Sequence, residues 1–201
     1  EGYLSENPCS RIPTWPVENP ASREWFTQDE IADIQKELPE QYHNLMHWAL
    51  ATGMRLSECL DLTSEDISKK MVRVLGKGRK VRYLPISENM SEIIVRLPKD
   101  RPFPFSRHQA SVAFSRAKKR AKIDKGHFHA LRDTAATWML HEGVSIYVVS
   151  RVLGHSSVVV TEKYYGHLAE SDLKAALDTI PNAQFGTDMA RKEKAGHGDQ
   201  P

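Results

Sequence analysis

Apolar residues recur at helical spacing through most of the chain, and in one stretch they alternate with basic residues. Ile31, Ile34 and Leu38 lie three to four residues apart, which is the period of one helix face. A helix is expected to begin after Thr27, because Thr27 can cap it and Glu30 can complete a capping box. The further predicted helices cover residues 40–52, 57–60, 87–97, 108–122, 131–141, 146–152, 158–165 and 169–179.

A β-hairpin is predicted between these helices. Residues 71–75 (MVRVL) and 81–85 (VRYLP) alternate apolar and basic side chains, which is typical of paired strands. The segment between them, GKGRK, makes the predicted tip basic and glycine-flanked. The fold class is therefore expected to be α+β and predominantly helical, with a small antiparallel β-sheet or hairpin.

The two ends of the chain lack this periodicity. Residues 1–21 contain four prolines, which predicts an interdomain linker or arm. Residues 181–201 are mostly polar and are expected to form a disordered tail. The folded domain is expected to cover residues 22–180.

Composition excludes few classes of protein. The length of 201 residues suits one domain, and a hydrophobic content of 40% is enough for a core. No apolar run is long enough to span a membrane, and no signal peptide opens the chain. Cys9 and Cys59 have no metal-ligand spacing, so a cytoplasmic, reduced protein is expected.

Charge is unevenly distributed although the net charge is only +2. Residues 1–70 carry a net charge of −7, residues 71–132 carry +12, and residues 133–201 carry −3. A basic block between acidic ends indicates a face that binds a polyanion. A set of solvated helix faces explains the same pattern, and charge alone leaves both readings open.

Several polar residues could carry chemistry, although each has an ordinary explanation by itself. Arg55 follows a helix stop at Gly53, and Glu58 is close enough in sequence to orient it. Lys77 lies between two glycines at the hairpin tip, where it could donate a proton. His129 and Arg132 are three residues apart at the start of a helix, so both can face one site.

The segment LGHSSVVVTEKYYGH, residues 153–167, adds a histidine and two tyrosines. Gly154 is expected to end a helix just before His155. Tyr164 and Tyr165 would point about 100° apart on the next helix, so only one of them can face a given site. A run of valines before aromatic residues is more often core than chemistry.

Taken together, the residues Arg55, Lys77, His129, Arg132, His155 and Tyr164 form a chemically specific set. Two arginines can neutralise the equatorial oxygens of a five-coordinate phosphorus. The lysine can protonate a leaving alkoxide, a histidine can take the tyrosine proton, and the tyrosine can form a covalent intermediate. No carboxylate cluster offers a metal site, so neither a metal nor another cofactor is expected.

The segments ATGMRLSECLDL, GKGRKVRYLPI, HALRDTAATWML and LGHSSVVVTEKYYGH resemble, in this order, the signature boxes of the tyrosine recombinases, or phage integrase family. The resemblance extends over residues 22–180. It implies that Arg55 and Arg132 bind phosphate, supported by Glu58, and that Lys77 is the general acid. It also implies that His129 is an acid or base and that His155 binds the phosphate. The following basic residues are expected to contact DNA: Arg79, Lys80, Arg116, Lys118, Lys119, Arg120 and Lys122.

Two spacing criteria of the family indicate different tyrosines as the nucleophile. The nucleophile usually lies nine residues after the histidine of the LGH box and three after a threonine, which indicates Tyr164 through His155 and Thr161. A histidine often follows the nucleophile by two positions, and His167 stands in that relation to Tyr165. The first criterion is preferred here, and Tyr164 is the expected nucleophile.

The resemblance implies a site-specific recombinase, an enzyme that cleaves and rejoins DNA through a 3′-phosphotyrosyl intermediate. Its partners would be double-stranded DNA and other protomers, as a tetramer on two duplexes, with accessory DNA-bending proteins considered as well. Residues 168–180 are the expected arm toward a neighbour. A bacterial or phage protein acting in the cytoplasm, at the nucleoid, is expected, and the chain would be the catalytic domain of a longer integrase.

Two departures and two rivals remain. The family's common acidic residue after the box histidine is Ala130 here, and its often basic residue after the second arginine is Asp133. A non-catalytic DNA binder is one rival, because residues 135–153 also read as a helix-turn-helix around Gly143. The other is a type IB topoisomerase-like enzyme, which shares the chemistry but relaxes DNA as a monomer.

Overall fold

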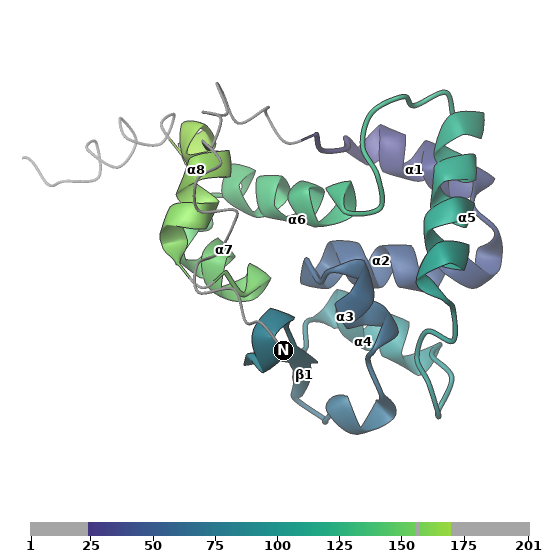
Figure 1. The fold of residues 1–201 in the computed structure, drawn as a ribbon, viewed down its shortest axis with the longest axis horizontal. Helices are drawn as coiled ribbons and strands as arrows, with labels where there is room; N and C mark the ends of the chain where they lie inside the picture. Colours follow the sequence, from purple (N-terminus) through teal and green to yellow (C-terminus); the bar gives the residue numbers. More distant parts are fainter. Residues whose placement is uncertain (1–23, 156, 170–201) are drawn as a thin grey trace, which may run out of the picture.

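The computed structural model describes residues 24–155 and 157–169, which form a mostly helical domain with one small antiparallel sheet (Figure 1). This confirms the predicted fold class. The helices are α1 (Gln28–Glu37), α2 (His43–Thr52), α3 (Leu56–Leu60), α4 (Glu88–Val95), α5 (Arg107–Arg120), α6 (Ala130–His141), α7 (Ile146–Leu153) and α8 (Val158–Ala169). The strands are β1 (Met71–Leu75) and β2 (Val81–Pro85), and short 3-10 turns lie at Glu40–Tyr42, Ser64–Asp66 and Lys77–Arg79.

The helices predicted between residues 28 and 165 all appear, with ends shifted by a few positions. The prediction over residues 158–165 is too short, because α8 continues to Ala169. The separate helix predicted over residues 169–179 lies outside the described residues apart from Ala169. The arm over 1–21 and the tail over 181–201 lie outside them entirely.

The capping box at the start of α1 is confirmed. Thr27 Oγ1 accepts from the backbone N–H of Glu30 at 3.2 Å, and Glu30 Oε2 accepts from the backbone N–H of Thr27 at 2.8 Å. The Thr27 hydroxyl satisfies a backbone N–H in the first turn of α1, and the Glu30 carboxylate satisfies the backbone N–H of Thr27 itself. Local sequence therefore determines where α1 begins.

Two left-handed glycines bring the ends of α2 and α7 together. Gly53 ends α2 with φ 61° and Gly154 ends α7 with φ 69°, a region that glycine adopts without strain. A Cβ on Gly53 would lie 2.7 Å from Cδ2 of Leu153, so the two helix ends are in close contact. Arg55 and His155 each follow one of these ends, and the contact therefore places two candidate residues near each other.

Figure 1 shows α6 running between the α1–α5 pair and the α7–α8 pair. The main core lies around α2, where Trp48 is fully buried, and continues to Phe26 and Phe114 between α1 and α5. A smaller cluster joins α6, α7 and α8 and contains Ala136, Leu140, Val149, Leu153 and Tyr165. Helix α6 thus contributes Ala130 and Leu131 to the main core and Ala136 and Leu140 to the smaller cluster.

The hairpin pairs β1 with β2, with Val72 opposite Leu84 and Val74 opposite Arg82. Val72, Val74 and Leu84 are buried against the main core. The opposite face of the hairpin is open, and Tyr83 is 60% exposed there. Arg82 lies on the covered face, because its side chain is only 13% exposed.

Candidate active site

The guanidinium of Arg132 is buried in the first turn of α6. Arg132 is only 1% exposed, and its Nη1 donates to the carbonyl oxygen of Gly53 at 2.7 Å. Its Nη2 is buried without a hydrogen-bond partner in the part of the chain that the structure describes. Burial, reinforced by the positive charge of Arg55, lowers the pKa of Arg132 to about 9. A buried cation with a vacant donor is a site for an anion.

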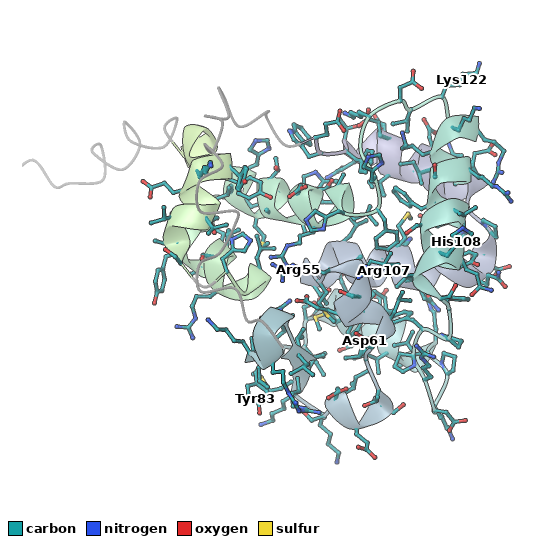
Figure 2. All side chains as sticks on the ribbon, viewed as in Figure 1. Arg55, Asp61, Tyr83, Arg107, His108 and Lys122 are labelled. Atoms are coloured by element: carbon teal, nitrogen blue, oxygen red, sulfur yellow. The ribbon has the colours of Figure 1, made fainter. Side chains whose placement is uncertain are left out.

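Arg55 is held by Glu58, as the sequence predicts. The backbone N–H of Arg55 donates to Oε2 of Glu58 at 3.0 Å, and its Nη1 donates to Oε1 at 2.8 Å. The Arg55 side chain keeps 33% exposure, whereas that of Glu58 has 3%. Figure 2 shows Arg55 near the ends of α2 and α7, well away from Lys122 at the far end of α5. The guanidinium is therefore fixed in direction yet open to a ligand.

Glu58 also binds Arg82, a residue that the sequence reading did not single out. Arg82 Nη2 donates to Oε2 of Glu58 at 2.8 Å and Nη1 to Oε1 at 3.2 Å. Burial by itself would raise the pKa of Glu58, but hydrogen bonds from Arg82 and from the backbone of Arg55 outweigh it and lower the pKa to about 2. The carboxylate is thus ionised throughout the neutral range.

Replacing Glu58 by glutamine is expected to reduce the free energy of unfolding by about 3 kcal/mol at pH 7. The folded-state pKa of about 2 lies below the ordinary 4.5. The stabilisation is therefore present above pH 4.5 and is lost as the pH falls toward 2. Urea unfolding of wild type and Glu58→Gln at pH 7 and pH 3 measures this.

The two curves should converge at the lower pH, and a gap independent of pH would contradict the ionic explanation. Asp66→Asn is the matched control, because Asp66 pairs with the half-exposed Arg73 on the same hairpin. A pair with one half-exposed partner is expected to contribute at most about 1 kcal/mol.

Each of the two candidate histidines shares a pocket with Arg55. His129 is exposed at the N-terminal end of α6 and lines a pocket with Arg55, Arg107 and Lys118. His155 lines a second pocket with Arg55, between the hairpin and α7. His155 Nδ1 is hydrogen-bonded to Oγ1 of the buried Thr161 at 2.7 Å, which fixes the orientation of its ring. The predicted residues Arg55, Arg132, His129 and His155 thus belong to one region of the molecule.

The tyrosines occupy different environments. Tyr165 is 2% exposed, and its hydroxyl donates to Oδ1 of Asp133 at 2.5 Å. It also interacts electrostatically with Arg132. Tyr164 is half-buried and packs against the α6–α7–α8 cluster, with Nζ of Lys163 5.8 Å from its ring centroid. The Tyr165 hydroxyl therefore lies beside the Arg132–Asp133 turn.

Lys77 lies in the turn between β1 and β2, where the structure describes its backbone only. Gly78 has φ 74°, and Arg79 follows with φ 59°, so the chain turns sharply around the lysine. The turn confirms the glycine-flanked hairpin tip. The role of Lys77 stays a prediction.

The predicted DNA contacts divide into two groups. Those exposed on the surface are Arg79, Lys80, Arg116, Lys119, Arg120 and Lys122. Lys118 is buried, and its Nζ donates to the carbonyl oxygen of Ile123 at 2.9 Å. Arg120 pairs with Glu37 at 2.9 Å and so ties α5 to α1. Arg107, which was not predicted, lies in the pocket beside Arg55 and His129.

Within residues 24–155 and 157–169, no group of three or more histidine, cysteine, aspartate or glutamate side chains could hold a metal ion. Over the same residues, the helices are too short or too polar for one of them to cross a membrane.

A model of the phage integrase family matches residues 24–171. The chain is 31% identical over 194 residues to the integrase of Escherichia phage 186, covering 87% of this chain and 56% of that one. It is 27% identical over 204 residues to tyrosine recombinase XerC of Oceanobacillus iheyensis, covering 88% and 67%. The chain thus spans between about half and two thirds of the relatives it matches.

Among solved structures, the catalytic domain of bacteriophage HP1 integrase superposes with a TM-score of 0.67 at 28% identity. The match covers 82% of this chain and 99% of that domain. A dimer of lambda integrase residues 75–356 bound to a COC' core site superposes with a TM-score of 0.64 at 22% identity, covering 73% of this chain and 63% of that one. The second likeness concerns the fold alone.

Proposed function

The chain belongs to the phage integrase family, and from that premise we propose that it is the catalytic domain of a site-specific DNA recombinase. The observation that carries the proposal is the buried Arg132, whose Nη2 has no hydrogen-bond partner among the described residues and so offers a donor to an anion. Arg55 lies nearby with its direction fixed by Glu58. Two guanidinium groups at one place suit the charge that develops on a phosphodiester under attack.

The proposed reaction begins when a tyrosine oxygen attacks the scissile phosphorus and the bond to the 5′ oxygen breaks. The tyrosine proton passes to a histidine, for which His129 is proposed, and Lys77 gives a proton to the departing oxygen. Arg55, Arg132 and His155 hold the phosphate oxygens. The products are a 3′-phosphotyrosyl link and a free 5′-hydroxyl, and attack by the hydroxyl of a partner strand reverses the step.

The nucleophile is proposed to be Tyr164, on its spacing from His155 and Thr161. Tyr165 is 2% exposed and its hydroxyl donates to Asp133 at 2.5 Å, which favours a structural role for that residue. Tyr165 is the alternative, because its hydroxyl lies beside the Arg132–Asp133 turn and a nucleophile must reach the anion that the arginines bind.

Double-stranded DNA and other protomers are the proposed partners. The related lambda integrase has been solved as a dimer on its core site, and XerH has been solved bound to its difH substrate. Four protomers on two duplexes are proposed for the complete reaction, with residues 168–180 as the contact arm. Exposed lysines and arginines on α5 and at the hairpin tip are proposed to grip the phosphate backbone, which would make binding weaken with salt.

Selection of DNA sequences that become covalently attached to the protein tests the proposal. The protein is mixed in EDTA with duplexes of randomised core sequence. Each duplex carries a nick, so that cleavage releases a short fragment and the covalent adduct is trapped. Complexes that survive sodium dodecyl sulfate are sequenced. Adducts with enriched sequences are expected, because the arginines and the lysine supply the charge and the proton that a metal would otherwise supply. The Tyr164→Phe/Tyr165→Phe double variant is the control and should give none.

Enriched sequences that are bound but never covalently attached would favour the non-catalytic DNA binder. Adducts without sequence preference, accompanied by relaxation of supercoiled plasmid, would favour the topoisomerase-like enzyme. Adducts that appear only when a divalent metal is added would contradict the proposed chemistry.

A further inference from the structure

We infer that Arg82 is a positioning residue that aligns the Lys77 hairpin, Arg55 and the His155 segment with one another. The inference deepens the proposed recombinase activity and rests on it. Arg82 lies on β2, the strand that follows the turn containing Lys77. None of the sequence signals used above identifies Arg82 as a functional residue.

All three nitrogens of the Arg82 guanidinium bind protein atoms. Nη1 and Nη2 donate to the two oxygens of Glu58, and Nε donates to the carbonyl oxygen of Val152 at 3.0 Å. The side chain is only 13% exposed. Arg132 differs, because its Nη2 has no such partner among the described residues. The hydrogen-bonding capacity of Arg82 is therefore directed at the protein, which favours a positioning role over direct contact with phosphate.

Arg82 contacts the segments that hold three candidate catalytic groups. Through Glu58 it meets the carboxylate that holds Arg55. Through Val152 it holds the end of α7 just before His155. A Cβ on Gly154 would lie 2.8 Å from Cδ of Arg82, so the guanidinium stem packs directly on that helix end.

The third group is the hairpin turn. A Cβ on Gly76 would lie 3.5 Å from Oε1 of Glu58 and 3.6 Å from Nη1 of Arg82. Gly76 directly precedes Lys77, so the Glu58–Arg82 ion pair forms the support under the lysine turn. A hairpin of only two strands has few other contacts to fix its tip. The ion pair therefore sets where the proposed acid sits relative to the phosphate.

Single-turnover cleavage of the DNA recovered in the selection tests this inference. Arg82→Lys keeps the charge but cannot make the three bonds together, and Arg82→Gln removes the charge. Each is measured on a normal phosphodiester and on a substrate with sulfur at the bridging 5′ position, whose thiolate leaves without a proton. The matched control is Arg73→Gln, on the partner strand, where Arg73 forms a half-exposed pair with Asp66.

Both Arg82 variants are expected to cleave the normal substrate about 100-fold more slowly than wild type, since a small misplacement of a catalytic group costs about that factor. Arg82→Gln is expected to melt at a lower temperature, because it removes a buried ion pair to Glu58, whereas Arg82→Lys keeps a cation there. The DNA affinity of both variants should stay close to that of Arg73→Gln. On the sulfur substrate the deficit should shrink at least to about tenfold, because the displaced acid is no longer needed.

An equal deficit on both substrates would overturn the inference, as would wild-type cleavage by a folded Arg82→Lys. If Arg82→Gln fails to fold, Arg82→Lys decides alone. Absence of cleavage by wild type on both substrates would instead count against the proposed function, so the two failures can be told apart.

Discussion

Replacing Tyr164 by phenylalanine is expected to abolish covalent capture of DNA, whereas Tyr165→Phe is expected to retain it. Tyr164 has the expected spacing from His155 and Thr161, whereas the Tyr165 hydroxyl is buried and donates to Asp133 at 2.5 Å. Removing the attacking oxygen leaves no route to the phosphotyrosyl bond, so the adduct should fall below detection. Denaturing gels of each variant with the selected suicide duplex measure it.

The comparison is matched by design, because both changes remove one hydroxyl from adjacent residues of α8. Tyr165→Phe also leaves Asp133 without that hydrogen bond and should cost about 1 to 3 kcal/mol of stability, so folding is checked by thermal unfolding. Loss of the adduct in Tyr165→Phe alone would show that the hydroxyl beside Asp133 is the nucleophile. The recombinase assignment would survive that result, and the spacing argument for Tyr164 would not.

The sequence predicted the helices well where local chemistry determines them. Thr27 and Glu30 form a capping box from groups three residues apart, and Gly53 and Gly154 end helices because only glycine adopts those angles cheaply. The hairpin is equally local, since alternation and a glycine-rich turn specify it. These features need no knowledge of the rest of the chain.

Arg82 shows what local patterns leave out. In β1 the basic residue Arg73 faces outward between buried valines, as alternation predicts. In β2 the exposed positions are Val81 and Tyr83, and Arg82 faces inward. The reason is Glu58, a carboxylate 24 residues earlier in the chain. Burial of a charge depends on a partner that only the tertiary structure supplies.

The basic residues of α5 also depend on partners that only the tertiary structure supplies. Lys118, Lys119 and Arg120 are neighbours in sequence and were predicted alike as DNA contacts. In the structure Lys118 binds the carbonyl of Ile123, and Arg120 binds Glu37 on α1. The helical period correctly separates buried from exposed positions only once the packing face of α5 is known. The same holds for the tyrosine pair, because the docking of α8 on α6 decides that Tyr165 is the more deeply buried of the two.

The site as a whole combines a rigid support with an unsatisfied charge. Glu58 interacts with Arg55, Arg82 and Arg132, so several cations share one buried carboxylate. Arg55 lines two pockets, and Arg132 keeps a donor that has no partner among the described residues. Arg132 is therefore expected to be needed for activity while adding little to stability, and both effects can be measured.

Replacing Arg132 by methionine is expected to slow single-turnover cleavage by at least about 1,000-fold while changing the free energy of unfolding by no more than about 1 kcal/mol. Loss of a charged donor to the transition state accounts for the first effect. For the second, the lost bond to Gly53 costs about 1 kcal/mol, and relief from burying an incompletely paired cation offsets it. Quenched-flow cleavage and urea unfolding measure the two quantities on the same preparation.

Lys118→Met is the contrasting variant for stability. Lys118 is also a buried cation, but its ammonium is bound to the carbonyl of Ile123, so its burial is compensated. It should therefore lose more stability than Arg132→Met. If instead Arg132→Met unfolds by several kcal/mol more easily than wild type, Arg132 is chiefly a link from α6 to α2 and its vacant donor has another explanation. If it is stable and inactive, the protein carries the unpaired charge for the phosphate that it binds.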